Sequence, residues 1–182
     1  MKNNIKLTLI IIGIVLAVAL FGVFAVNSIP NKVISYEEQI TTAQSEIKIQ
    51  EKRRADLIPN LVDCVKEYDK HEYETLMAVI EARGTNSDAT STEIQTMISA
   101  VAEQYPELKS NTNYKELMNE LSTTENKIAQ TRSNFNEWVA KYNSYTKKFP
   151  NKQILNFVGY EVTEYQKLTF DVSSDAPTNL FN

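Results

Sequence analysis

The chain has 182 residues, of which 42% are hydrophobic and 23% are charged, and its formal net charge is -4. This length supports one hydrophobic core of ordinary size rather than two. Because phosphate groups are bound by clustered basic side chains, the acidic balance excludes nucleic acid as an expected partner.

The first element is an uncharged apolar run from Leu7 to Val26. About 20 residues at 1.5 Å each match a hydrocarbon core of roughly 30 Å. The competing interpretation is a cleaved signal peptide, with Val23 and Ala25 before the cut, but the run exceeds the usual ~7 to 15 apolar residues of such a peptide. We therefore predict that the chain contacts the lipid bilayer through Leu7 to Val26, as a single-pass anchor in the cell membrane.

The positive charges near this run predict its orientation. Lys2 and Lys6 lie before the run, whereas only Lys32 lies close behind it. Because basic residues favour the cytoplasmic side, the N-terminus is expected inside and the following domain on the outer side.

Beyond Pro30, apolar residues recur at alternating spacings of three and four, which predicts a helix over about 31–55. A second helix is expected over about 56–83, with Gly84 as its C-terminal cap. A helix corner is predicted between them, where Asp56 caps the second helix and Pro59 lies in its first turn. Asn60 is expected to contribute to the same corner.

Residues 85–91 are rich in Thr, Asn, Ser and Asp and are predicted to form a loop. A shorter helix then starts after a cap at Ser91 or Thr92 and ends at Pro106. The longest helix is expected over about 114–148, stopped by Pro150. The five prolines are all expected at segment ends.

These elements predict an all-α fold, in which an N-terminal transmembrane helix is followed by an antiparallel four-helix bundle. The expected organisation is a short N-terminus and anchor over residues 1–29, a bundle over 30–150 and a C-terminal tail over 151–182. The weak alternation of the tail is compatible with short extended segments or with a mobile strap, packed on the bundle.

Six polar residues occupy helix positions whose neighbours above and below are apolar. They are Gln50, Arg54, Glu72, Arg83, Glu125 and Arg132. Buried unpaired charge costs several kcal/mol, so these side chains should pair across helices or open onto water. The first interpretation is a structural layer of ion pairs that fixes helix register. The second is a polar pocket that holds a small anion or a peptide carboxylate.

Catalytic chemistry finds little support in the composition. Cys64 is the only cysteine and His71 the only histidine, which argues against disulfides, multi-thiolate zinc sites and Ser-His-Asp triads. Only Gly84 and Gly159 lie beyond the apolar run, so a glycine-rich phosphate loop is excluded. We expect no catalytic site, no metal and no cofactor.

Several ordered motifs resemble the LemA family of bacterial membrane proteins. They are Arg53-Arg54-Ala55-Asp56-Leu57-Ile58-Pro59-Asn60-Leu61-Val62, His71-Glu72, Ala82-Arg83, Tyr105-Pro106-Glu107-Leu108-Lys109, Thr124-Glu125-Asn126, Arg132, Phe135-Asn136 and Tyr142-Asn143. The resemblance implies a single N-terminal transmembrane helix and a helical-bundle domain, and it implies no catalytic activity. It also implies an external N-terminus, which opposes the orientation expected from Lys2 and Lys6.

Two functions remain open on this basis. The first is a non-enzymatic, membrane-anchored scaffold or interaction partner in the bacterial cell envelope, which would bind other envelope proteins or itself. The alternative is a sensor or binding module in which the polar layer holds a small anion or carboxylate.

Overall fold

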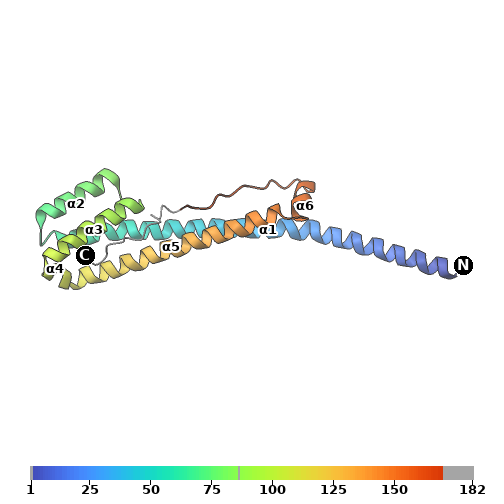
Figure 1. Ribbon diagram of the computed structural model, residues 1–182, viewed down its shortest axis with the longest axis horizontal. Helices are drawn as coiled ribbons and strands as arrows, with labels where there is room; N and C mark the ends of the chain where they lie inside the picture. Colours follow the sequence, from blue (N-terminus) through green and yellow to red (C-terminus); the bar gives the residue numbers. More distant parts are fainter. Residues whose placement is uncertain (1, 86, 170–182) are drawn as a thin grey trace, which may run out of the picture. The chain divides into compact units, whose positions relative to one another are not determined.

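A computed structural model describes residues 2–85 and 87–169. The described residues form six helices and no strand: α1 (Lys2–Val65), α2 (Lys70–Arg83), α3 (Asp88–Gln104), α4 (Pro106–Ser110), α5 (Thr112–Lys147) and α6 (Asn151–Phe157) (Figure 1). The predicted all-α class with an apolar N-terminal helix is confirmed. The division into an anchor, a bundle and a tail at residues 29 and 150 stays a prediction.

The chain divides into two compact units. Unit 1 combines Met1–Thr41 with Phe135–Asn182, and unit 2 is Thr42–Asn134. Helices α1 and α5 each contribute one part to each unit. The two units are described separately below.

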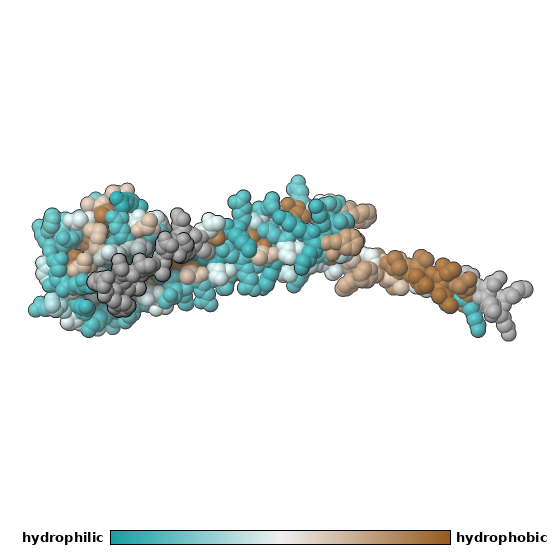
Figure 2. Space-filling view, in the orientation of Figure 1, coloured by the Kyte–Doolittle hydropathy of each residue, from teal (hydrophilic) through white to brown (hydrophobic). Residues whose placement is uncertain are grey.

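The N-terminal part of α1 is apolar and exposed. It contains an 18-residue stretch with a mean hydropathy of 3.1, long and apolar enough to cross a membrane. Leu9, Phe21 and Phe24 are 63%, 71% and 69% exposed, and the run forms a continuous apolar surface (Figure 2). A single-pass transmembrane helix requires this arrangement, because in a bilayer such side chains face lipid.

The predicted helix corner at Asp56, Pro59 and Asn60 is wrong, because α1 continues through all three residues to Val65. Neither polar side chain caps a helix there. Asp56 is exposed beside Lys52, and the Asn60 side-chain amide donates to the Asp56 carbonyl at 3.0 Å, one turn back along α1. The buried face of α1 explains the continuation, since Ile58 and Leu61 are both fully buried and a break would expose them.

Pro59 nevertheless lacks the N–H that would bond to the carbonyl of Ala55, four residues earlier. The hydroxyl of Thr85, just beyond the end of α2, donates to this carbonyl at 3.5 Å. The bond is long, but it supplies a donor where the helix has none. Pro30 also lies within α1, so two of the five prolines do not mark segment ends.

The break between α1 and α2 lies instead at residues 66–69. Asp69 has an extended backbone, and its carboxylate accepts from the N–H groups of His71 and Glu72 as the N-cap of α2. Gly84 ends that helix with a φ of 70°, so the predicted cap is confirmed. Helix α3 starts at Asp88, capped by Ser87, which is earlier than the predicted start at residues 91 or 92.

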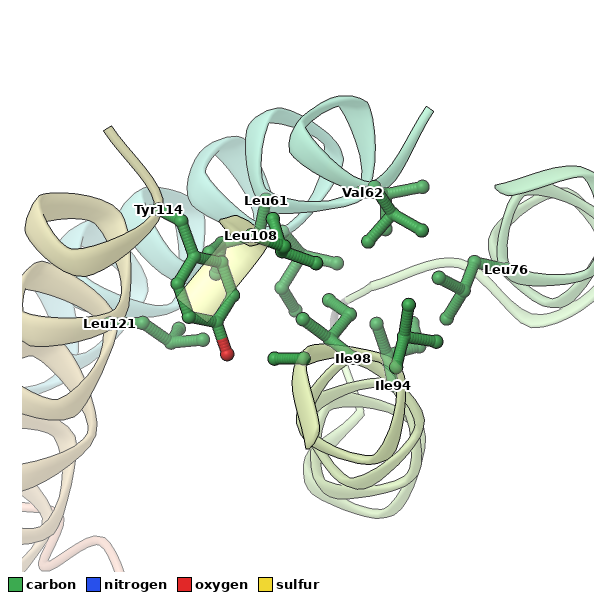
Figure 3. Packing of buried hydrophobic residues seen from close by; sticks show 12 residues of the cluster. Leu61, Val62, Leu76, Ile94, Ile98, Leu108, Tyr114 and Leu121 are labelled. Carbon is green, nitrogen blue, oxygen red and sulfur yellow. The ribbon is translucent and has the colours of Figure 1, made fainter. Parts of the chain in front are cut away.

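Unit 2 is built around a core to which five helices contribute. The side chains converge from α1, α2, α3, α4 and α5, with Leu61, Leu76, Ile98, Leu108 and Leu121 all at most 1% exposed (Figure 3). Within this unit α1 and α5 run antiparallel, because Glu51 pairs with Arg132 whereas Arg53 pairs with Glu120. The predicted apolar faces of these two helices are therefore real packing faces.

Unit 1 contains the other parts of α1 and α5. The ring of Tyr36 lies 5.5 Å from that of Tyr145 and 6.3 Å from that of Trp138, centroid to centroid. Val33 and Val139 are fully buried. The two helix segments therefore pack through a mixed aromatic and aliphatic seam.

Residues 160–169, here called the strap, run without regular secondary structure along α5 in unit 1. The side chain of Asn136 bonds to both main-chain groups of Leu168: its amide donates to the carbonyl at 2.9 Å, and its oxygen accepts from the N–H at 2.7 Å. Two turns further along α5, the Asn143 amide donates to the Tyr165 carbonyl at 2.8 Å. These asparagines hold the strap much as a neighbouring strand would.

The start of the strap is fixed by Glu37 of α1. One carboxylate oxygen accepts from the hydroxyl of Tyr142 and the other from that of Tyr160, both at 3.0 Å. Burial and the bond to Glu37 raise the pKa of Tyr160 to about 12. Helix α6 was not predicted in the tail, and the last part of the predicted tail, 170–182, lies outside the described residues.

Candidate functional site

The most prominent polar feature of unit 2 is the buried arginine Arg54 of α1. Its side chain is 1% exposed, and its guanidinium donates to Asp88 Oδ1 at 2.7 Å and to Glu125 Oε2 at 3.4 Å. A guanidinium stays charged at all accessible pH values, so its burial requires such partners. Arg54 thereby joins α1 to α3 and to α5.

Asp88 is the centre of the cluster, because it also binds Arg132 of α5. Arg132 Nη1 donates to Asp88 Oδ2 at 2.6 Å, and Nη2 donates to Oδ1 at 3.1 Å. Asp88 stands in the first turn of α3, where the unpaired N–H groups of the helix favour a negative charge. The fork-to-fork geometry is the strongest form of an arginine–carboxylate pair.

The charges in this cluster nearly compensate one another. Arg132 also donates to Glu51 Oε1 of α1 at 2.8 Å, so two arginines face the three carboxylates of Glu51, Asp88 and Glu125. The sum is 2 − 3 = −1 for these five side chains. We call this set, Glu51, Arg54, Asp88, Glu125 and Arg132, the ion-pair cluster.

The hydrogen bonds of the cluster shift the pKa values of Asp88 and Arg132 in the directions that favour their charged forms. The hydrogen bonds from Arg132 hold the pKa of Asp88 below its usual range, with Arg54 acting in the same direction against the cost of burial. The bonds to Asp88 and Glu51 raise the pKa of Arg132. Asp88 and Arg132 are therefore both ionised at neutral pH and paired with each other.

Hydroxyl and amide groups complete the surroundings of Glu125. Its second oxygen accepts from the hydroxyl of Ser91 at 3.2 Å and from the amide of Gln95 at 3.4 Å. Gln50 lies one turn before Arg54, and its Oε1 is buried without a hydrogen-bond partner among the described residues. The polar layer thus extends along the inner face of α1.

The structure brings together three of the six residues predicted for the polar layer, namely Arg54, Glu125 and Arg132. Arg83 instead pairs with Glu93 at 2.5 Å, on the surface, where its side chain is 59% exposed. Glu72 lies in the first turn of α2 and donates its N–H to Asp69. The reason is the interruption of the helix at residues 66–69, which changes the direction in which the following side chains of α2 point.

Sequence reasoning missed Glu51 and Asp88. Asp88 was assigned to a loop, although Ser87 is a favoured N-cap residue and would have placed Asp88 in the first turn of a helix. Glu51 stands one residue from the predicted stripe and reaches Arg132 only through the length of both side chains. No sequence pattern distinguishes it from an ordinary surface glutamate.

Other chemistry has little support in the described part of the chain. Cys64 lines a hollow of about 490 Å³ with Asn60, Leu117 and three more polar residues. Burial, with Asp63 and Glu67 adding to it, raises the pKa of the Cys64 thiol, so the thiol stays protonated and is a poor nucleophile. Among the residues described, no three His, Cys, Asp or Glu side chains are placed to hold a metal ion.

Comparisons with known proteins give two relatives of this chain. Protein LemA of Metamycoplasma hominis is 26% identical over 161 residues, which cover 79% of this chain and 74% of that protein. Magnetosome protein MamQ of Magnetospirillum gryphiswaldense is 36% identical over 66 residues, which cover 36% of this chain but only 24% of MamQ.

A family model, the LemA family, matches residues 43–181. The match includes all of unit 2 except its first residue, and hence every member of the ion-pair cluster. It also includes the asparagines of α5 and the strap that they bind. The resemblance seen in the motifs is confirmed, and the chain belongs to the LemA family.

Proposed function

We propose that this chain is a non-enzymatic, single-pass membrane scaffold, whose helical domain binds other proteins of the bacterial cell envelope or a second copy of itself. The observation that carries the proposal is the form of α1. One helix presents an exposed apolar run at its N-terminal end and a fully packed face at Ile58 and Leu61. Such a helix supports a tethered domain and supplies no reactive group.

The ion-pair cluster supports a structural role over ligand binding. Both arginines already face carboxylates, and the cluster carries one excess negative charge. An incoming anion would have to displace Asp88 and would then meet Glu51 and Glu125. The alternative function, a sensor that holds a small anion or carboxylate, is therefore less well supported than the scaffold.

The orientation belongs to the same proposal. Lys2 and Lys6 precede the apolar run, and basic residues favour the cytoplasmic side. The domain is accordingly placed on the outer side of the cell membrane. Membership of the LemA family and the likeness to a magnetosome protein support a membrane location.

The proposal is tested by photo-crosslinking in native membranes. A photoreactive residue replaces Glu103 or Asn119, both exposed in unit 2, and Leu9 in the apolar run serves as the control. The two unit 2 positions should yield discrete cross-linked protein bands, whereas Leu9 should yield lipid adducts. A chain that forms only lipid adducts, or none, at both unit 2 positions contradicts the scaffold function.

The alternative is tested by thermal unfolding of the full chain in detergent with increasing acetate, a small carboxylate. The scaffold proposal predicts no specific change in melting temperature. A rise that saturates, and that the substitution Arg132→Gln abolishes, would favour the sensor instead.

A further inference from the structure

The end of the apolar run is covered by protein, unlike the rest of the run. Ala25 is 9% exposed and Ile29 is 7% exposed, while the preceding Val23 and Phe24 are 62% and 69% exposed. Ala25 belongs to the apolar run that ends at Val26. Some element of unit 1 therefore lies against α1 at the depth where the apolar run ends.

That element is α6. Helix α5 runs antiparallel to α1 in unit 1: Tyr145 stands against Tyr36, and α5 ends two residues later. The strap turns back along α5, since Leu168 reaches Asn136. Helix α6 lies between these two segments and is drawn against α1 beyond the end of α5 (Figure 1). Its Leu155 is fully buried, as expected for the side that faces α1.

The residues that flank or end α6 are strongly apolar and exposed. Phe149, just before α6, is 82% exposed, and Phe157, its last residue, is 83% exposed. Val158 follows at 37% exposure. Apolar colour gathers where α6 meets α1, next to the apolar run (Figure 2). Outside the apolar run, no other described large apolar side chain is as exposed as these two phenylalanines.

The position of α6 along the membrane-spanning helix indicates what covers these exposed side chains. The apolar run supplies its own boundary, because Val26 is its last residue and the polar Asn27 and Ser28 follow. An element packed on Ala25 and Ile29 therefore stands at the boundary between acyl chains and headgroups. Phe side chains on surface elements insert at the boundary between headgroups and acyl chains, and the exposed Lys148 and Lys152 beside them suit the headgroup layer. A protein partner at this corner would have to displace lipid.

We propose that Phe149, Phe157 and Val158, here called the α6 corner, insert into the membrane interface and form a second contact of the chain with the bilayer. The contact adds to the spanning segment and orients unit 1 on the membrane surface. It rests on the proposed membrane anchor, and it holds for either orientation of the domain.

The test is fluorescence quenching in vesicles with the full chain reconstituted. Trp138 is the only tryptophan, so Trp138→Phe provides a silent background. In this background Phe149→Trp and Phe157→Trp are compared with Phe24→Trp in the apolar run and with Ile49→Trp, an exposed apolar position of unit 2 (62%). The vesicles are phosphatidylcholine, with or without bromine on the upper part of the acyl chains. Circular dichroism verifies that each variant keeps its helix content.

The proposal expects brominated lipid to remove most of the emission of Phe149→Trp and Phe157→Trp, and their spectra to be shifted to the blue of Ile49→Trp. Unquenched emission at both corner positions, with strong quenching at Phe24→Trp, overturns the α6 corner and leaves the anchor intact. Unquenched emission at Phe24→Trp overturns both proposals. If the corner variants lose helix content, Lys152→Cys and Ile49→Cys replace them, each made in a Cys64→Ser background and labelled with a polarity-sensitive dye. Only the label at Lys152→Cys should report a surrounding less polar than water.

Discussion

Arg54 of α1 binds α3 and α5 through one buried guanidinium, and Asp88 is its nearest counter-charge, at 2.7 Å. The isosteric substitution Asp88→Asn keeps the shape and removes the charge shared by both arginines. We expect a loss of about 1 to 3 kcal/mol in the free energy of unfolding, as for a buried charged group that loses its partner. Urea denaturation of the full chain in detergent, followed by circular dichroism, measures it.

The matched control is Glu93→Gln, because its carboxylate is exposed like that of Asp88 but pairs with an exposed arginine. Arg83 is 59% exposed, whereas Arg54 is 1% exposed. Exposed pairs contribute at most about 1 kcal/mol. Equal losses in the free energy of unfolding for the two substitutions would show that burial of the arginine does not strengthen the contribution of the ion-pair cluster.

The lowered pKa of Asp88 makes stability depend on pH. Because the folded state holds this carboxyl ionised more strongly than the unfolded state does, its contribution is complete above the unfolded pKa of about 3.9 and is lost as the pH falls toward the lower folded value. We expect the stability difference between the native chain and Asp88→Asn to shrink below about pH 4. Urea midpoints measured at pH 7 and in acid check this, and a difference that is independent of pH would contradict it.

The ion-pair cluster shows how far single residues can be predicted. Arg54 and Arg132 stand on apolar stripes with regular spacing, so their inward placement followed from periodicity within one uninterrupted helix each. Arg83 had the same spacing in the sequence, but the helix is interrupted between Arg54 and Arg83, and the Arg83 side chain therefore points outward. Which carboxylate pairs with each arginine depends on where the helices start. The spacing of residues around Asp88 does not show that α3 starts there.

At the scale of elements, Pro59 is the informative position. A proline normally marks the first turn of a helix, whereas here α1 continues past it and Thr85 donates to the carbonyl that the ring leaves without a donor. We expect Pro59→Ala to raise the free energy of unfolding by about 1 to 3 kcal/mol, since proline is about 3 kcal/mol less favourable than alanine inside a helix. Urea denaturation measures the gain.

Thr85→Val supplies the control for this explanation. Its cost should be larger in the native chain than in the Pro59→Ala background, where the new N–H at position 59 satisfies the Ala55 carbonyl. A destabilising Pro59→Ala would instead mean that the fixed φ of the proline, and not its missing donor, decides the local energy.

The helices themselves were largely predictable, and their junctions were not. The stripes of α1 and α5 and the cap at Gly84 followed from spacing and from glycine chemistry. The interruption at residues 66–69 contains no proline or glycine. The only signal for it is Asp69 followed three residues later by Glu72, a spacing that resembles a capping box. Tertiary burial of Ile58 and Leu61 outweighed the local preference of Pro59.

For the molecule as a whole, the apolar run determines how the chain partitions. We expect the full chain to stay in the membrane pellet after extraction at alkaline pH, because withdrawing such a run from lipid exposes it to water. A chain that lacks residues 7–26 should leave the pellet. Immunoblotting of pellet and supernatant measures both, and release of the full chain would contradict a spanning segment.

The asparagines that hold the strap have a consequence for how this protein can change over time. Asn136 and Asn143 bind carbonyl and N–H groups of the strap, which every residue except proline provides. Replacing exposed strap residues such as Val162, Gln166 or Lys167 leaves those bonds intact. Selection on these bonds therefore acts on two side chains of α5, and exposed strap positions such as Val162 are free to drift in sequence. Tyr160 and Tyr165 are not free in this way, because their side chains contact Glu37 and Tyr142.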